Sequence, residues 1–462
     1  MMPKFWDFSR IDAVLRRRPR LFFVGIGGIQ MHALALLLRG RGFSVSGSDR
    51  TEGETVLRLR AAGIPVTIGH CAENIEGAEA LVYSLAIAQD APELCAARKR
   101  GLPLISRPDL LGWLMRAYRH RIAIAGMHGK STTTAMLAHV LSACEKAPTV
   151  LGGAPLDKTG TVFWEGKDDI FLCEACEYKD AFLCLAPDIA VVLNVEHEHP
   201  DYFKSYADVL RSFSQYVAGA KAVILPAHEE EPSLPPDARI LRFGVGEGAD
   251  VTATDMTVRE GCASFRLCIQ EKACGEVRLA VPGMHNVKNA LAALAVAYAL
   301  GLDMEAACRS LADFHGTPRR LARRGRLWGM TVYDDYAHHP TEIRASLSAL
   351  RGILAEDGGC GRLLCVFEAH TYSRTAAFFA DFVQALSMAD LPILLPIYAA
   401  REKNESGVSA EQLAASVKNG RYAACVEEAF SILAHEAHAG DILALMGAGS
   451  IRSLTDELPC EP

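Results

Sequence analysis

The stretch from residue 122 to residue 137, IAIAGMHGKSTTTAML, decides the fold class of this chain. An apolar run, expected to be a buried strand, leads into a glycine turn, and Lys130 with several hydroxyl side chains then opens a helix. In such a turn backbone N–H groups surround phosphate oxygens, a lysine neutralises their charge and a hydroxyl group binds magnesium. The stretch predicts a phosphate-binding loop with the short spacing G-x-x-G-K-S, in an α/β domain.

A second glycine turn lies upstream, in LFFVGIGGIQMHALALLLRGRGFSVSGSD at residues 21–49. The pattern predicts a strand, a turn, a helix and a second strand that ends at Asp49, which together form a βαβ unit. Glycines in such a turn let the backbone approach a diphosphate. Because Gln30 stands where the third glycine of G-x-G-x-x-G is expected, a purely structural turn remains the alternative.

The remaining strand and helix signals divide the 462 residues into three α/β domains. A new strand begins after a boundary near residues 116–120, and short alternating strands between residues 249 and 282 suggest an antiparallel subsheet. A third series of strand-like runs begins with MTVYDDYA at residue 330. We therefore expect domains at residues 1–117, 118–315 and 316–462.

Composition excludes several classes of protein. A net charge of -7 argues against nucleic-acid binding, and no apolar run is long enough for a membrane span or a signal peptide. We expect a cytoplasmic protein whose 14 scattered cysteines stay reduced. Cys173 and Cys176 form a C-x-x-C pair, for which packing is favoured over a zinc or redox role because no second pair stands at zinc-site spacing.

Polar side chains follow several of the expected strands. FLCEACEYKD contains Glu174 and Glu177, and NVEHEHPDYF contains Glu196, Glu198 and His199. Strand ends at one sheet edge form the ligand sites of α/β proteins, and carboxylates suit magnesium. A magnesium shell that includes Glu174 and His199 is therefore predicted beside the phosphate loop. YDDYAHHPTE and FEAHTYSRT place further Asp, His, Tyr and Arg residues after strands of the third domain.

Taken in order, these motifs resemble the Mur ligase family from about residue 21 to residue 452. The motifs are GIGGIQM, GMHGKSTTT, EACEY, NVEHEHPDYF, PGMHNVKNALAA, GTPRR, DDYAHHPTE and FEAHTYSRT. The resemblance implies a Rossmann-like UDP-binding domain, a central P-loop ATPase domain and a Rossmann-like C-terminal domain that receives an amino acid. It also implies that ATP and Mg²⁺ activate the carboxylate of UDP-N-acetylmuramate as an acyl phosphate, which L-alanine then attacks. The implied enzyme is a monomer or homodimer that makes a peptidoglycan precursor.

The resemblance also assigns roles to individual residues. The UDP substrate would contact Gly25, Gly27, Gly28, Asp49, His70 and Ser84. ATP would contact Gly126, His128, Gly129, Lys130, Ser131, Thr132, His285, Asn286, Asn289, Arg320 and Asp335. Magnesium would be bound by Ser131 or Thr132 with Glu174 and His199, and L-alanine would be oriented by His338, His370 and Arg374. Of these, Lys130, Glu174, His199, His338 and Arg374 are the expected catalytic residues.

Four positions depart from the commonest family pattern. They are Gln30 for glycine, Met127 for threonine, Cys176 for aspartate and Thr371 for arginine. Lys130, Glu174, His199 and Arg374 remain, so an active ligase is expected. Three alternatives stay open: a ligase that attaches a cell-wall tripeptide to the same sugar nucleotide, a non-catalytic nucleotide sensor, and a nicotinamide dehydrogenase suggested by the first glycine turn alone.

Overall fold

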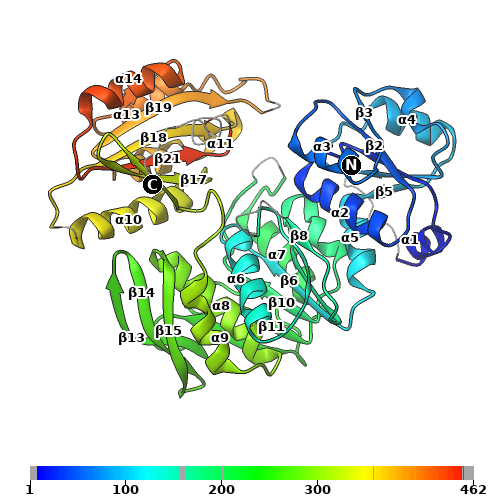
Figure 1. The fold of residues 1–462 in the computed structure, drawn as a ribbon, viewed down its shortest axis with the longest axis horizontal. Helices are drawn as coiled ribbons and strands as arrows, with labels where there is room; N and C mark the ends of the chain where they lie inside the picture. The colour runs from blue at the N-terminus through cyan, green and yellow to red at the C-terminus, as the bar shows by residue number, and fades with distance from the viewer. Residues whose placement is uncertain are drawn as a thin grey trace.

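The computed structural model describes residues 8–156, 162–199, 202–356, 358–400, 402–449 and 451. Three sheets follow one another along the chain, each covered by helices, as Figure 1 shows. The outer ends of the predicted first and third domains, residues 1–7 and 452–462, lie outside the described residues. Within the described part, no helix is both long enough and apolar enough to cross a membrane.

The N-terminal sheet has five parallel strands in the order β3-β2-β1-β4-β5. The strands are β1 (Leu21–Val24), β2 (Val45–Asp49), β3 (Val66–Ile68), β4 (Ala80–Tyr83) and β5 (Leu104–Ser106). The helices are α1 (Phe8–Leu15), α2 (Ile29–Gly40), α3 (Glu54–Ala61), η1 (Ala72–Ile75), α4 (Pro92–Lys99) and α5 (Arg107–Met115). The predicted βαβ unit is confirmed as β1, α2 and β2. Every residue of β1 is buried, as expected for the central strand of a parallel sheet.

The central sheet has ten strands in the order β15-β14-β13-β12-β11-β10-β6-β9-β7-β8. Its strands through β12 are β6 (His120–Ala125), β7 (Thr149–Leu151), β8 (Phe163–Trp164), β9 (Ile170–Glu174), β10 (Ile189–Val192), β11 (Ala222–Pro226) and β12 (Arg239–Gly244). The helices are α6 (Lys130–Ala143), η2 (Tyr178–Cys184), α7 (Tyr206–Val217), α8 (Met284–Ala299), α9 (Met304–Ser310) and η3 (Leu311–Asp313). Helix α8 is buried over most of its length and packs against α6, so the phosphate loop lies on a rigid support.

The predicted antiparallel strands are confirmed as β13 (Val251–Arg259), β14 (Cys262–Ile269) and β15 (Lys272–Pro282). They do not form a separate sheet, because β13 pairs in parallel with the end of β12 and so extends the central sheet. The alternation that predicted them is seen as alternating burial along β14.

The C-terminal sheet has six strands in the order β16-β17-β21-β18-β19-β20. They are β16 (Ala322–Leu327), β17 (Met330–Asp335), β18 (Leu363–His370), β19 (Leu391–Tyr398), β20 (Arg421–Tyr422) and β21 (Ile442–Gly447). The helices are α10 (Pro340–Glu356), α11 (Tyr372–Ala377), α12 (Phe379–Leu386), α13 (Ala410–Ser416) and α14 (Val426–Glu436). All pairings except β16 with β17 are parallel.

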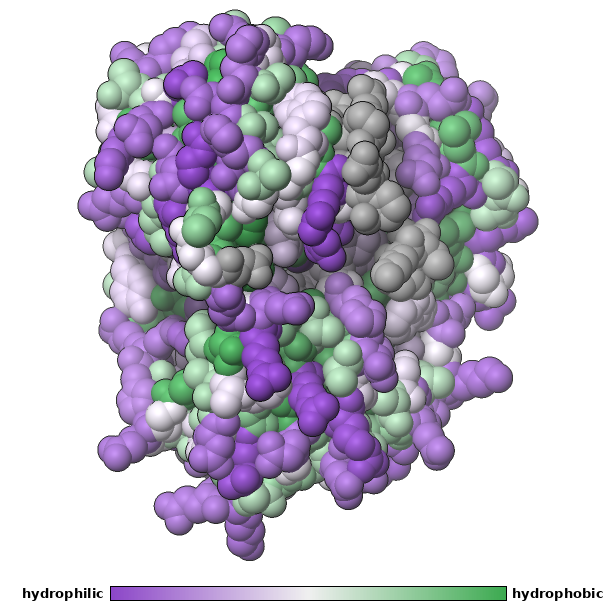
Figure 2. Space-filling model, turned by 60° about the vertical axis from the view of Figure 1, so that its left-hand side comes forward, coloured by the Kyte–Doolittle hydropathy of each residue, from purple (hydrophilic) through white to green (hydrophobic). Residues whose placement is uncertain are grey.

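A cleft separates the β13–β15 extension from the C-terminal sheet. It is lined by residues of β15, by the connection at residues 315–321 and by β16 and β17, including Arg320, Arg323, Arg324 and Arg326. Figure 2 shows this side of the molecule, where polar side chains cover most of the surface and apolar ones form small separate patches. Residues 315–321 connect the central and C-terminal domains covalently. The domains also meet at the β13–β14 turn, where the Gly261 N–H donates a 3.4 Å hydrogen bond to Glu356 of α10, and at the site described next.

Candidate active site

The glycine turn between β6 and α6 has the backbone shape that its sequence predicts. Gly126 and Gly129 have φ values of +135° and +83°, which side chains rarely allow. A Cβ atom at Gly129 would lie 2.6 Å from Oδ1 of Asn289, and one at Gly126 would lie 2.9 Å from Cβ of Leu193. Both glycines are required because neighbouring elements approach the backbone so closely.

Asn194, just beyond β10, fixes the tip of this turn. Its Oδ1 accepts a hydrogen bond of 2.9 Å from the backbone N–H of His128, and its Nδ2 donates one of 3.0 Å to the His128 carbonyl. The two bonds hold the loop open with its following N–H groups at the N-terminus of α6, which favours anions. No motif in the sequence indicates a role for Asn194.

Lys130 is held by its own loop and by Glu177. The Lys130 ammonium lies 2.9 Å from Oε2 of Glu177 and donates to the carbonyl groups of Gly126 and Met127. Burial alone would lower the pKa of Lys130, but the Glu177 carboxylate outweighs burial and raises it. Lys130 is therefore fully protonated at neutral pH, as neutralisation of phosphate charge requires.

Two groups of carboxylates stand beside the loop. Glu174, the last residue of β9, accepts a 3.2 Å hydrogen bond from Ser131 Oγ and another from the Gly153 N–H. Glu177, Glu198 and His199 form a separate cluster, in which the possible ligand atoms lie within 4.8 Å of one another. His199 Nε2 lies 3.3 Å from Glu177 Oε1. His199, which was predicted to bind magnesium together with Glu174, is therefore paired with Glu177.

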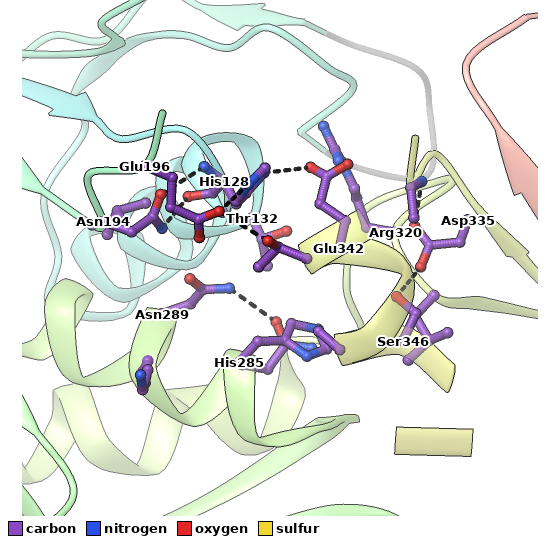
Figure 3. A pocket seen from close by; sticks show the side chains of 18 of the residues that line it. His128, Thr132, Asn194, Glu196, His285, Asn289, Arg320, Asp335, Glu342 and Ser346 are labelled. Atoms are coloured by element: carbon purple, nitrogen blue, oxygen red, sulfur yellow. Dashed lines mark hydrogen bonds and ion pairs between the residues drawn. The ribbon is translucent and has the colours of Figure 1, made fainter. Parts of the chain in front are cut away.

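Three contacts join the C-terminal domain to the loop and to the neighbouring end of β10, and each involves at least one residue labelled in Figure 3. His128 Nδ1 lies 3.1 Å from Oε1 of Glu342, and Thr341 Oγ1 donates a 2.9 Å hydrogen bond to Glu196. Arg320 Nη2 donates a 3.4 Å hydrogen bond to Ser131 Oγ. Burial opposes the charge of His128, but Glu342 and Glu196 outweigh it and raise the pKa of His128 to about 10.

A cavity of about 220 Å³ extends from the loop between α8 and the C-terminal domain. Its lining includes the sequence-predicted residues His128, Gly129, Thr132, His285, Asn286, Asn289, Arg320 and Asp335. Figure 3 shows His285 and Asn289 on one side and Asp335 with Ser346 on the other. Burial lowers the pKa of His285 to about 4, so its ring is neutral. The cavity joins the anion-binding loop to a chamber with amide and imidazole groups on α8, which can form hydrogen bonds with a base.

Asp335 gives a testable pH dependence. Burial raises its pKa to about 6, although Ser346 and the Ala337 N–H donate to it. Between about pH 4 and pH 6 the folded protein therefore keeps a proton on Asp335 that the unfolded chain has lost. The free energy of unfolding falls by about 3 kcal/mol in total as pH rises through this range. Asp335→Asn should be progressively more stable than the parent across this range, as measured by thermal unfolding of both proteins at about pH 4.5 and pH 7.5. An unchanged difference between the two pH values would contradict this assignment.

The residues expected to orient L-alanine gather at the ends of β17 and β18. His338 and His370 have ring centroids 5.8 Å apart, and Arg374 Nη1 lies 3.3 Å from His370 Nδ1. Arg374 also forms a 2.7 Å ion pair with Glu198 of the central domain. Burial lowers the pKa of His338 to about 4, so this ring is a neutral hydrogen-bonding group.

The residues expected to contact UDP lie together at the other end of the molecule, along the C-terminal edge of the N-terminal sheet. The Gly27 N–H donates a 2.8 Å hydrogen bond to Oδ2 of Asp49, which fixes the glycine turn. His70 Nδ1 lies 2.8 Å from the fully buried Glu93. Ser84 follows β4, and Gly25 and Gly28 complete the turn that precedes α2.

The structure therefore brings the predicted residues together in three groups, one on the N-terminal sheet, one at the phosphate loop and one at the ends of β17 and β18. The residues that sequence reasoning did not assign are mostly acids and amides that orient other groups. They are Glu93, Asn194, Glu196, Glu342 and Ser346. Asn194 and Glu196 follow β10, and this position at a strand end could have indicated a role in the site. Glu93, Glu342 and Ser346 lie on helices, where no such pattern marks them.

Comparison with known proteins extends over nearly the whole chain. The model of the Mur ligase family, catalytic domain, matches residues 20–119. The Mur ligase middle domain matches residues 124–297, and the Mur ligase, glutamate ligase domain matches residues 319–449.

Similar proteins include the UDP-N-acetylmuramate–L-alanine ligase of Agathobacter rectalis, which is 40% identical over 95% of this chain and 97% of its own length. The ligase of the same name from Caldanaerobacter subterraneus subsp. tengcongensis is 39% identical over 95% and 96%. The crystal structure of the UDP-N-acetylmuramate-alanine ligase of Thermotoga maritima aligns with a TM-score of 0.80 and 26% identity, covering 95% of this chain and 97% of that one. A murein peptide ligase from Psychrobacter arcticus shares the fold, with a TM-score of 0.70 at 24% identity over the same shares of the two chains.

Proposed function

The chain belongs to the Mur ligase family, and from this premise we propose that it joins L-alanine to the carboxylate of UDP-N-acetylmuramate in peptidoglycan precursor synthesis. It is an ATP-dependent ligase, and relatives with this activity in their names are about 40% identical to it over 95% of the chain. The proposed residue roles are those set out from the sequence, with ATP at the phosphate loop and the sugar nucleotide on the N-terminal sheet.

The observation that carries this proposal is the position of the phosphate loop between domains. Lys130 and the N–H groups at the start of α6 belong to the central domain, and Arg320 reaches Ser131 from the C-terminal domain. A triphosphate on this loop would meet positive charge from two domains. Asp335, His285 and Asn289 line the adjoining cavity, which accommodates the rest of the nucleotide in this proposal.

The reaction requires activation because a carboxylate is a poor electrophile. One carboxylate oxygen attacks the terminal phosphorus, the bond to the bridging oxygen breaks, and ADP leaves with that electron pair. The neutral alanine amine then attacks the acyl carbon, the bond from that carbon to the phosphate oxygen breaks, and inorganic phosphate leaves with its electron pair. The nitrogen loses one proton, so that the amide keeps one N–H. Lys130 stabilises the charge on the phosphoryl group in the first step, and it does so in a site that excludes much of the water.

Magnesium fits the side chains beside the loop. Ser131, Glu174 and the Glu177, Glu198 and His199 cluster offer a hydroxyl group, carboxylates and one imidazole, and oxygen donors suit Mg²⁺. Burial opposes ionisation of Glu198, but His199 and Arg374 outweigh it and lower its pKa to about 2. In this proposal Glu174 and His199, together with Ser131 or Thr132, would hold the ion, which would supply positive charge beside the phosphates.

Replacing Glu174 with glutamine should raise the Mg²⁺ concentration needed for half-maximal activity by about 10- to 100-fold, because an amide oxygen carries no charge. Phosphate release measured across a magnesium titration tests this. Glu247→Gln is the matched control, since Glu247 is exposed on the same domain. An unchanged magnesium requirement would remove Glu174 from the proposed shell.

The function itself is tested by product mass. The purified protein is incubated with ATP, Mg²⁺, UDP-N-acetylmuramate and a mixture of amino acids, and separately with the cell-wall tripeptide. We expect a product heavier by one alanyl residue, formed together with ADP and phosphate. A tripeptide product alone would assign the recycling reaction instead, and ATP binding without any amide product would indicate a nucleotide sensor.

A cytoplasmic location and a monomeric or homodimeric state remain predictions. ATP and nucleotide sugars are cytoplasmic metabolites, which supports the first. Sedimentation analysis of the full chain at several protein concentrations tests the second.

A further inference from the structure

Arg107 lies where the N-terminal domain meets the central domain. It is the first residue of α5, which packs against η2. Cys184 of η2 donates a 3.6 Å hydrogen bond to Asp109, and a Cβ atom at Gly112 would lie 2.1 Å from the Cys184 carbonyl oxygen. The two elements are therefore in direct contact, and the position of Arg107 relative to the central domain is fixed.

The guanidinium of Arg107 has no carboxylate partner among the described residues. Its Nη1 donates to Oε1 of Gln30, and no ion pair of Arg107 is found in this part of the chain. Other partly buried arginines differ, since Arg121 pairs with Asp188 at 2.7 Å and Arg374 pairs with Glu198 at 2.7 Å. Removing a cation from water without a counter-ion is costly, so a partly buried guanidinium of this kind indicates an anionic ligand.

The groups around Arg107 leave its charge uncompensated. Burial lowers its pKa, and the groups that act against this are, in order of the size of their effect, the thiols of Cys176, Cys184 and Cys173, and then Glu174. A protonated thiol carries no charge, so none of these cysteines is a permanent counter-ion. Glu174 is already engaged by Ser131 and Gly153.

Arg107 also lies between the glycine turn of the N-terminal domain and the phosphate loop. Gln30, its hydrogen-bond partner, is the second residue of α2 and follows the Gly25–Gly28 turn. On the other side, α5 packs against η2, which begins directly after Glu177, and Glu177 pairs with Lys130 at 2.9 Å. An anion bound by Arg107 would therefore lie between the expected sugar-nucleotide turn and the phosphate loop.

Two of the four departures from the family pattern meet at this position. Gln30 replaces a glycine and supplies the acceptor that orients the guanidinium. Cys176 replaces an aspartate, and a carboxylate there would compete for Arg107. The pair of substitutions thus leaves an oriented cation without an internal counter-ion.

We propose that Arg107 binds the lactyl carboxylate of the sugar nucleotide beside the phosphate loop, and that Gln30 is the positioning residue that orients the guanidinium. The inference rests on the proposed function, since it names how that substrate presents its reacting group. An arginine can hold one carboxylate oxygen through a charge-assisted hydrogen bond and leave the other oxygen directed at the terminal phosphate.

The test is calorimetric binding in the absence of ATP, with two probes that differ in the carboxylate. UDP-N-acetylmuramate carries the lactyl group, and UDP-N-acetylglucosamine carries the same diphosphate without it. Arg107→Met should weaken the first probe by about 10- to 100-fold and leave the second within about twofold. Arg116→Met is the matched control, because Arg116 is exposed at the other end of α5.

Equal weakening of both probes would show that Arg107 binds the diphosphate, and unchanged binding of both would show that it binds neither; either result overturns the proposal. Failure of the unsubstituted protein to bind either probe would instead count against the proposed function. Arg107→Lys keeps the charge and should recover part of the affinity, which separates a binding role from a folding defect.

Gln30→Leu tests the positioning role by steady-state kinetics. Leucine has a similar size but accepts no hydrogen bond, so KM for UDP-N-acetylmuramate should rise about 3- to 10-fold while KM for ATP and for L-alanine stays unchanged. A general structural defect would change all three constants or the melting temperature. Equal changes in all three KM values would therefore remove Gln30 from this role.

Discussion

Replacing Lys130 with methionine should lower kcat for ligation by at least about 1,000-fold. The Lys130 ammonium is buried in the phosphate loop, and its pKa is raised because Glu177 outweighs the effect of burial. Methionine fills a similar volume but carries no charge, so the negative charge that develops on the transferred phosphoryl group loses a cation at short range. Phosphate release and product mass, measured with all three substrates at saturation, test this expectation.

Lys146→Met is the matched control for Lys130→Met. Lys146 is exposed just beyond the other end of α6, so its loss removes the same charge from the same domain without touching the loop. Because the substitution at Lys130 leaves the buried Glu177 with His199 as its remaining ion-pair partner, thermal unfolding is measured for both variants. Turnover at the parental rate in a folded Lys130→Met protein would contradict the proposed ATP site.

Arg374→Ala should lower kcat/KM for L-alanine by about 100- to 1,000-fold. Arg374 reaches from the C-terminal domain to Glu198 at 2.7 Å, and both side chains are largely buried in this contact. Its removal takes from the buried Glu198 carboxylate one of the cationic groups that lower its pKa and leaves His199 at 4.0 Å as another. It also removes the cation that the sequence associates with the alanine carboxylate. Initial rates across an alanine titration measure the effect.

Two further variants show which part of Arg374 matters. Arg374→Lys keeps the charge but loses the planar donor set, so an intermediate loss is expected. Arg326→Ala removes an exposed arginine of the same domain and should leave the rate unchanged. If Arg374→Ala kept parental kcat/KM for L-alanine, Arg374 would have no part in amine binding or in the domain contact.

Most of the fold could be predicted because each domain repeats a strong local pattern. The runs at residues 21–49 and 122–137 join an apolar strand to a glycine turn and a helix, and both form as expected. The antiparallel strands were also visible in the alternation after residue 249. Their attachment to the central sheet could not be predicted. The parallel pairing of β12 with β13 involves only Phe243 and Gly244, opposite Val251 and Thr252. Two residue pairs are too few to give a periodic pattern in the sequence.

The site residues that could be predicted are those that belong to a local sequence motif. Lys130 and Gly129 are of this kind, because the loop geometry follows from adjacent residues. The groups that pair with them come from distant segments: Glu177 is 47 residues from Lys130, and Glu342 belongs to another domain than its partner His128. Strand ends suggested the neighbourhood of His199, but not that Glu177 is its partner, because that pairing depends on how the chain turns after β9.

The contacts between the central and C-terminal domains have a consequence for turnover. Arg374 with Glu198, Thr341 with Glu196, and His128 with Glu342 join side chains of the two domains beside the phosphate loop. If ligands enter and leave between these domains, each catalytic cycle breaks and remakes the three contacts. Escape of ADP and the amide is therefore tied to domain separation, and solvent viscosity should slow the enzyme at this stage more than at the chemical steps.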